Sequence, residues 1–204
     1  ALLRRIEELG GQVVSSFAHY GAVRALVPLA RPEDLASENA VRSIRPADRP
    51  LAHKTNTSEG VAAHRADAAR ATYGVDGAGV RVGVLSDSIE ALGALQATGD
   101  LPADVTCLPG QAGSGNSEGT AMLEIVHDVA PGAALYFATA GGGQAQFAAN
   151  ILALQAAGCK VIVDDIIYLN EPVFQDGIIA QAVETAAAAG AVYFSSAGNS
   201  GNLN

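Results

Sequence analysis

Five acidic and amide residues follow or flank apolar runs in this sequence and are the candidates for chemistry. Asp87 follows VRVGVLS, Asp164 and Asp165 end VIVDD, Glu118 opens a helical stretch, and Asn199 lies in SSAGNSG. In an open parallel sheet the reactive groups gather beyond the carboxyl ends of the strands, where helix N-termini also point. These residues are therefore predicted to lie near one edge of a sheet.

Asp87 and Glu118 form a possible acid–base pair. Two carboxyl groups within hydrogen-bond distance in a partly desolvated cleft share a proton, and the ionised member can act as a general base. Each residue also has a structural explanation: Asp87 as a turn residue at a strand end, Glu118 as a complement to the helix macrodipole. Asp164 and Asp165 could equally cap neighbouring backbone N–H groups.

The helical stretch that begins at Glu118 predicts how that carboxylate is oriented. At about 100° per residue, Met122, Ile125 and Val129 fall on the face of Glu118, so this face is predicted to pack on the sheet and Glu118 to be partly buried. His127 falls about 180° away and about 13 Å further along the axis. It is therefore not expected to replace Glu118 at the same site.

Strand and helix signals alternate from residue 80 to residue 204. The apolar runs VRVGVLS, DVTCL, ALYFATA, VIVDDII and AVYFSS predict strands. Helices are predicted over 118–129, 144–157 and 176–189, and the last two stop at Gly158 and Gly190. This alternation predicts an α/β domain whose mainly parallel sheet is doubly wound, with helices on both faces.

Residues 1–46 predict a separate small α+β domain. LLRRIEEL reads as a helix, QVVSSF and AVRALVPLA as strands, PEDLASE as a second helix and VRSIRP as a third strand. Residues 47–79 are polar and read as a linker with one helix that ends at Gly74. The domain boundary is predicted within this linker.

Composition excludes several classes of partner. The net charge is -9 and no run of Lys or Arg forms a stripe, so nucleic acid is not expected to bind. No apolar run reaches the roughly 20 residues that a membrane-spanning helix needs. Cys107 and Cys159 do not define a disulfide framework, and buried free thiols are the alternative to a disulfide. No cofactor is predicted: the acidic balance permits calcium, but the sequence has no oxygen-ligand loop pattern.

Three segments resemble the motifs of subtilisin-like serine peptidases, in the same order. VRVGVLSDS is similar to the first catalytic-strand motif, an apolar strand ending in Asp. EGTAMLEIVHDVAPGAALYFATA resembles the second motif, in which His-Gly-Thr opens a helix, but Glu118 stands in the place of that histidine. SSAGNSG resembles the oxyanion-hole segment and places Asn199 as the side-chain donor. Residues 1–46 resemble the small ferredoxin-like pro-domain that inhibits and chaperones such enzymes.

A glutamate at the histidine position resembles the sedolisins, the serine-carboxyl branch of the same fold. In sedolisins this Glu pairs with an Asp one turn later, where Met122 stands here, so Asp87 is the expected partner of Glu118. Asn199 is subtilisin-like, since sedolisins carry Asp at that place. Asp164 and Asp165 are assigned to substrate binding, and the division of roles between them stays open.

The resemblance implies an incomplete sheet of subtilisin type and a secreted or extracellular endopeptidase that acts on peptide or protein substrates. The family nucleophile lies in a Gly-Thr-Ser motif after the oxyanion segment, and no serine of this chain fits it. The expected partner is therefore the remainder of the peptidase domain, which carries the serine, and the chain alone is expected to be inactive.

Two other functions are compatible with some of these features. A pseudo-peptidase or binding scaffold would have the same fold, with Glu118 as an inactivating replacement. A phospho-receiver domain also gathers acids at strand ends, but it needs a lysine at the end of its last strand, and AVYFSSAGN has none.

Overall fold

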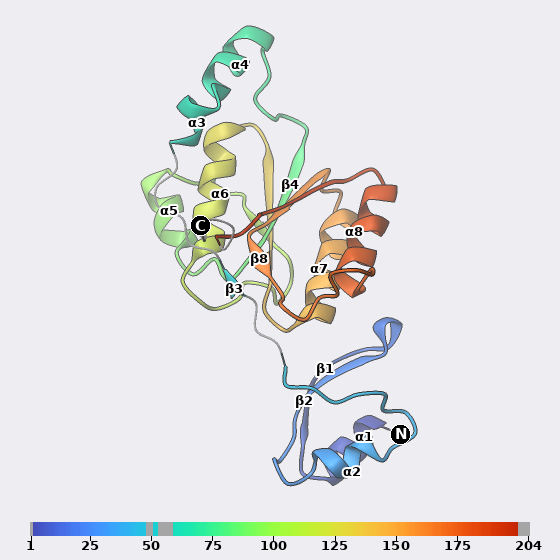
Figure 1. Cartoon of the computed structure of the whole chain (residues 1–204). Coiled ribbons are helices and arrows are strands. Elements are labelled where there is room, and N and C mark those ends of the chain that lie inside the picture. The colour runs from blue at the N-terminus through green and yellow to red at the C-terminus, as the bar shows by residue number, and fades with distance from the viewer. Residues whose placement is uncertain (1, 48–50, 53–58, 200–204) are drawn as a thin grey trace.

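The chain folds around a parallel five-stranded sheet in the order β5-β6-β4-β7-β9 (Figure 1). The computed structural model describes residues 2–47, 51–52 and 59–199. The strands of this sheet are β4 (Arg81–Ser86), β5 (Thr106–Cys107), β6 (Ala134–Thr139), β7 (Val161–Asp164) and β9 (Val192–Ser195). Every neighbouring pair is parallel, which confirms the predicted α/β class with a mainly parallel sheet.

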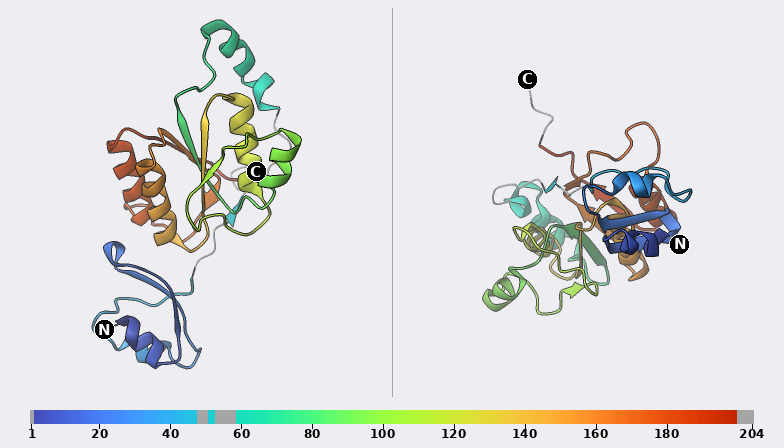
Figure 2. Two further views of the ribbon diagram at one scale, coloured as in Figure 1. Left: turned by 180° about the vertical axis from the view of Figure 1, so that it is seen from behind. Right: turned by 90° about the horizontal axis from the view of Figure 1, so that it is seen from below.

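Helices cover both faces of this sheet (Figure 2). Helices α5 (Leu92–Thr98) and α6 (Glu118–Val129) lie on one face, and α7 (Gln144–Ala156) and α8 (Ile178–Ala188) lie side by side on the other. Each layer has its own apolar core, centred on fully buried Phe137 and Leu123 on the α6 face and on Ile151 and Leu154 on the α7 face. The sheet is thus buried from two sides, as the continuous apolar strands predict.

Strand β4 is central, and the order of the strands around it defines a crevice. After β4 the chain moves to β5 and β6 on one side, whereas after β7 it moves to β9 on the other. In such sheets ligands bind where the connections of two adjacent strands part in opposite directions. Here that point lies between the carboxyl ends of β4 and β7, which Asp87 and Asp165 directly follow.

Helix α6 begins and ends at the predicted residues, but it presents a different face to the sheet. Gly119, Thr120 and Leu123 are buried, whereas Ile125 and Val129 are 42% and 37% exposed. The predicted sheet-facing side is therefore wrong for Ile125 and Val129, whereas Met122 does pack against the core. A Cβ at Gly119 would overlap the ring of Phe137 and lie 2.7 Å from the carbonyl oxygen of Ser88, so the helix approaches the sheet through this glycine.

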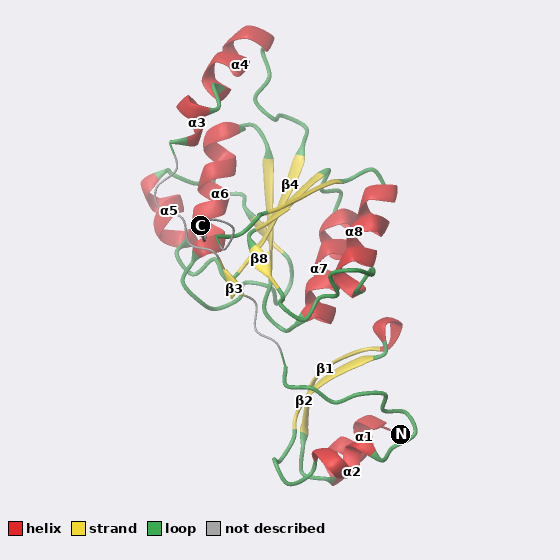
Figure 3. Cartoon of the chain, viewed as in Figure 1, coloured by secondary structure: helices red, strands yellow, loops and turns green. Residues whose placement is uncertain are grey.

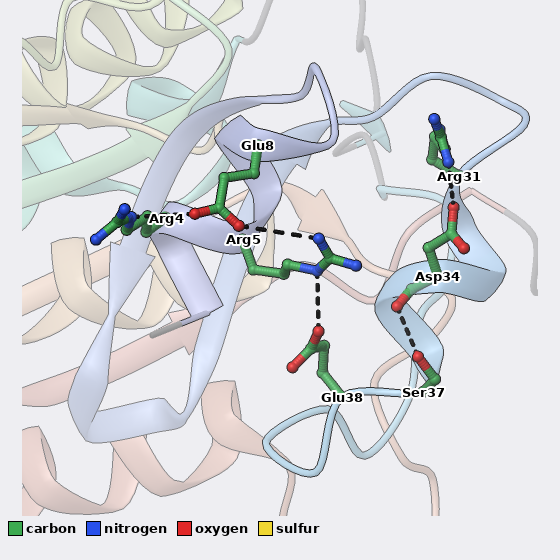
Figure 4. Close-up of polar contacts among 7 residues, drawn as sticks. All are labelled: Arg4, Arg5, Glu8, Arg31, Asp34, Ser37 and Glu38. Carbon is green, nitrogen blue, oxygen red and sulfur yellow. Dashed lines mark hydrogen bonds and ion pairs between the residues drawn. The ribbon is translucent and has the colours of Figure 1, made fainter.

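The N-terminal module consists of a hairpin with two short helices (Figure 3). Its elements are α1 (Leu2–Glu8), β1 (Gln12–Phe17), η1 (Ala18–Tyr20), β2 (Ala22–Leu26) and α2 (Pro32–Ala36). Strands β1 and β2 are antiparallel, and Ile6 and Leu35 are the buried residues of the two helices. An ion pair between Arg5 and Glu38 at 3.0 Å joins α1 to the segment after α2 (Figure 4).

The third strand predicted in this module, VRSIRP, is wrong. Residues 42–47 are exposed and form no strand. No neighbouring strand in the described part of the module pairs with them, and Pro46 lacks the N–H that a ladder would need. Arg45 instead donates a hydrogen bond to Oε1 of Gln144 at 2.8 Å, and Tyr20 packs against the core beside α7. These contacts tie the module to the N-terminus of α7.

The predicted linker helix is two helices, α3 (Gly60–Ala63) and α4 (Ala66–Tyr73). They are separated at Arg65, whose φ of 55° is left-handed, and α4 ends at Gly74 as predicted. Arg70 donates to the carbonyl oxygens of Asp128 and Val129 at 2.8 Å each, and so satisfies the C-terminus of α6. The linker helices are thus anchored on the α6 layer.

One predicted strand, VIVDDII, is divided in two. Strand β7 stops at Asp164, and after Asp165 a short strand β8 (Ile166–Ile167) leaves the sheet. It pairs antiparallel with β3 (Leu51–Ala52), which belongs to the segment after the N-terminal module. A segment of the chain therefore lies as an extended strand beside the acidic end of β7.

Both cysteines are free thiols. Burial raises the pKa of Cys159 to about 11, and nearby Arg81 opposes this rise only in part. The Cys159 thiol therefore stays protonated and packs as a small apolar side chain. Within the described residues, no helix is long and apolar enough to cross a membrane.

Replacing Leu123 by Ala tests the packing of α6. Leu123 is fully buried, so Leu123→Ala is expected to lower the free energy of unfolding by about 2–5 kcal/mol, measured by urea denaturation. Ile125→Ala on the same helix is the control, and its loss should stay below about 1 kcal/mol because Ile125 is exposed. Equal losses in the two variants would contradict the observed orientation of α6.

Candidate active site

The carboxylate of Asp87 binds the N-terminal end of α6. Its Oδ1 accepts hydrogen bonds from the backbone N–H groups of Ser88 at 2.5 Å and Gly119 at 3.2 Å, and its Oδ2 accepts one from Asn116 at 2.5 Å. Ser117, the N-cap residue, makes no side-chain cap bond to the helix. Asp87 therefore supplies, from the neighbouring strand, the negative group that a helix N-terminus favours.

Tight packing holds Asp87 in this position. Thr139, at the end of β6, donates from Oγ1 to the carbonyl oxygen of Asp87 at 2.7 Å. A Cβ at Gly115 would lie 2.5 Å from Oδ2 of Asp87, and a Cβ at Gly113 would overlap its carbonyl oxygen. Gly113 also has a φ of 72°, which favours glycine. The loop before α6 can thus wrap around Asp87 only because it is rich in glycine.

Two serines connect the same loop to the segment after β4. Ser88 is fully buried, and its Oγ accepts a hydrogen bond from the N–H of Ser117 at 3.1 Å. The Oγ of Ser117 in turn accepts one from the N–H of Ala91 at 3.1 Å. Ser117 has a left-handed φ of 60°, an uncommon conformation for a residue with a side chain. Its hydrogen bonds to both sides stabilise the turn that precedes Glu118.

Glu118 is the first residue of α6. It directly precedes Gly119, whose N–H donates to the Asp87 carboxylate. It is half-buried, and its Oε2 atom is fully shielded from solvent. The structure therefore places the Asp87 carboxylate at the first turn of helix α6, which starts with Glu118. That the two carboxyl groups share a proton stays a prediction.

Asp164 lies at the buried end of β7, in register with Leu85 of β4 and Ser195 of β9. Its Oδ1 accepts hydrogen bonds from the N–H of Ile166 and from Oγ of Ser195, both at 3.0 Å. Burial raises the pKa of Asp164 above its ordinary value, while polar contacts with Tyr193, Ile166 and Ser195 oppose the rise. Asp164 thus caps a backbone N–H group, that of Ile166, as the structural alternative to substrate binding predicts.

Asp165 directly follows Asp164, and Asn199 lies on the segment after β9. Asp165 is half-buried between β7 and β8. Asn199 lies in an exposed bend after β9, on a segment whose Ser196 donates its N–H to the carbonyl oxygen of Asp164 at 3.1 Å. Substrate binding by Asp165 and oxyanion stabilisation by Asn199 stay predictions.

A pocket of about 530 Å³ opens next to these residues. It lies between β8 with its following loop, the end of β9 and the first turns of α8. Its walls are mostly apolar, and three acids of the described part of the chain line it: Asp164, Glu171 and Glu184. The described residues that line it are Phe147, Asp164, Ile166, Ile167, Tyr168, Glu171, Ile179, Ala180, Val183, Glu184, Tyr193, Ser195, Ser196, Ala197 and Gly198.

Tyr193, Glu171 and Glu184 line this pocket but were not among the sequence candidates. Burial and the neighbouring Asp164 raise the pKa of Tyr193. The alternation of side chains along a strand places Tyr193 and Ser195 on one face, so the sequence did contain a signal for Tyr193. Glu171 carries no comparable signal, because it lies in the irregular loop between β8 and α8.

No protein-family model matches this sequence, and a search of curated proteins finds no relative of it. Among the described residues, no group of three or more His, Cys, Asp or Glu side chains is placed to hold a metal ion.

Replacing Asp87 tests its role at the N-terminus of α6. Asp87→Ala leaves the N–H groups of Asn116 and Gly119 without their acceptor, so the free energy of unfolding should fall by about 1–3 kcal/mol. Asp104→Ala, at an exposed position, is the matched control and should change it by less than about 0.5 kcal/mol. Urea denaturation measures both, and an equally small effect of the two changes would contradict the capping role.

The raised pKa of Asp164 predicts a pH dependence of stability. Between the ordinary and the raised pKa, folded Asp164 keeps a proton that the unfolded chain releases, so its contribution to stability falls as pH rises through this window. Asp164→Asn lacks this titration. The stability of the variant relative to the unchanged protein should therefore rise with pH, measured by urea denaturation from about pH 3 to about pH 8. Parallel stability curves would show that Asp164 has an ordinary pKa.

Proposed function

We propose that this chain is the N-terminal part of a serine endopeptidase of the subtilisin and sedolisin type, with a sheet of subtilisin type and residues 1–46 as its pro-domain. The observation that carries the proposal is the antiparallel pairing of β3 with β8 beside Asp165. Addition of a strand to an exposed strand edge is a general way to bind an extended peptide through its backbone. An endopeptidase must bind its substrate in such an extended form.

The position of the acids supports the same reading. Asp87 and Asp165 follow the two strands that flank the crevice, and Glu118 begins the helix whose N-terminus Asp87 binds. Three side chains that the resemblance names as catalytic or substrate-binding thus come from sequence-distant segments to one end of the sheet. This is the end at which open α/β sheets hold their ligands.

In the proposed mechanism Glu118 is the general base. The serine Oγ attacks the peptide carbonyl carbon while its proton moves to the Glu118 carboxylate, and Asp87 holds and polarises Glu118. The protonated Glu118 then gives the proton to the leaving amine, and water releases the acyl group by the reverse sequence. Asn199 donates to the oxyanion, a contribution of about 3–4 kcal/mol in the transition state.

The nucleophilic serine comes from polypeptide outside these 204 residues, because no serine of this chain fits the family motif. Strand β3 occupies the edge of β8 and so competes with any substrate for it. We place the enzyme outside the cell, from the family resemblance alone.

A peptide-binding scaffold without catalysis is the second candidate, because the pairing of β3 with β8 needs only peptide binding. The two candidates differ at Glu118. A scaffold needs no base there, whereas an endopeptidase does.

Replacing Glu118 decides between them in a form of the protein that also contains the Gly-Thr-Ser segment. Glu118→Gln should lower kcat for a fluorogenic peptide by about 10²–10⁴-fold, because the amide cannot accept the serine proton. Glu124→Gln on the same helix is the control and should retain activity.

Two results would contradict the proposed mechanism. One is full activity of the Glu118→Gln enzyme. The other is covalent labelling of the 204-residue chain by a fluorophosphonate, which would mean that the chain contains its own activated serine.

A further inference from the structure

The pocket beside β8 is placed to receive a side chain of a bound peptide. Ile166 and Ile167 of β8 line it, and so does the segment 196–198, which leads directly to Asn199. A peptide that pairs with β8 as β3 does points every second side chain to the same side. With about 530 Å³ the pocket has room for one long side chain.

The chemistry of the pocket is apolar along its walls and acidic at defined points. Phe147, Ile179 and Val183 provide apolar contact area. The acidic side chains of the described lining are Asp164, Glu171 and Glu184. None of the described residues that line it is Lys, Arg or His. The described lining therefore offers negative charge without a basic residue to neutralise it.

Glu171 is the acid whose geometry points to a ligand. Its Oε1 accepts hydrogen bonds from the N–H groups of Ile179 and Ala180 at 3.2 Å each, which fixes the carboxylate at the N-terminus of α8. Its Oε2 is buried and has no hydrogen-bond partner among the described residues. A buried carboxylate oxygen without a partner is costly unless a donor or a cation reaches it.

We propose that this pocket binds the arginine or lysine side chain of the substrate residue whose carbonyl carbon is attacked. The inference rests on the proposed function, because it takes the peptide to lie on β8 with that carbonyl near Asn199. The methylene stem of the basic residue packs on the apolar walls, and its charged head reaches Glu171 and Asp164. A phenylalanine would fill the walls but leave Oε2 of Glu171 buried without a donor.

Binding of product-like peptides to the 204-residue chain tests this specificity without catalysis. Three acetylated tetrapeptides that differ only in their last residue, arginine, citrulline or phenylalanine, are titrated by calorimetry at neutral pH. Citrulline has the length of arginine but no charge. The arginine peptide is expected to bind at least about tenfold tighter than the citrulline peptide, the size of one charge-assisted hydrogen bond. Strand β3 competes with all three peptides alike, so it does not change this ratio.

Variants assign the preference to the acids. Glu171→Gln keeps the size of the side chain and should reduce the arginine-to-citrulline ratio to about threefold or less. Glu171 also binds the end of α8, so the thermal unfolding of this variant is measured alongside. Glu184→Gln changes an exposed lining residue and should lower the ratio by a smaller factor. Glu90→Gln, exposed and outside the pocket, should leave the ratio unchanged.

The outcomes separate this inference from the proposed function. Binding of the citrulline or phenylalanine peptide as tightly as the arginine peptide overturns the basic specificity, and leaves peptide binding on β8 in place. The same holds for an arginine preference that survives in both the Glu171→Gln and Glu184→Gln variants. Failure of all three peptides to bind even at millimolar concentrations, at which a free peptide competes with a tethered strand, overturns peptide binding on β8 and with it the proposed function.

Discussion

The contact between the Asp87 carboxylate and the N-terminal amides of α6 is the interaction on which the candidate site depends. It joins the end of the central strand to the start of a helix whose first residue is Glu118. A helix N-terminus has backbone N–H groups without intrahelical partners, and a carboxylate satisfies them while it complements the helix dipole. Because Asp87 does this from outside the helix, the position of Glu118 is fixed relative to the sheet and not only relative to its own helix.

Glycine makes this contact possible. Gly113 and Gly115 let the loop before α6 close around Asp87, and Gly119 lets the helix itself approach Phe137 and Ser88. A side chain at any of the three would overlap Asp87 or Phe137, so the strand and the helix would have to move apart. The polar site and the apolar core thus share one constraint, since the helix that carries Glu118 also buries Leu123 on the same sheet.

The second organising feature is the division of VIVDDII at Asp165. Strand β7 stays in the parallel sheet, while β8 turns away and offers its edge to β3. This break places the edge that pairs with β3, a buried acid and an apolar pocket next to one another. The N-terminal module contacts the same half of the molecule through Arg45 and Tyr20, so the segment that forms β3 starts close to β8.

The sequence alone determined the elements whose signals are local. Helix α6 has the predicted bounds, α4 ends at Gly74, Asp87 follows an apolar strand and Asp164 ends one. Periodicity, glycine stops and burial patterns predict these features because they act over a few residues. Tertiary structure decided the rest. Close packing at Gly119 turned Ile125 outward, and VRSIRP formed no strand because it has no partner in the described module. Glu171 lines the pocket only because its loop folds back onto α8. The sequence could not predict this, since contacts between distant segments leave no periodic trace in it.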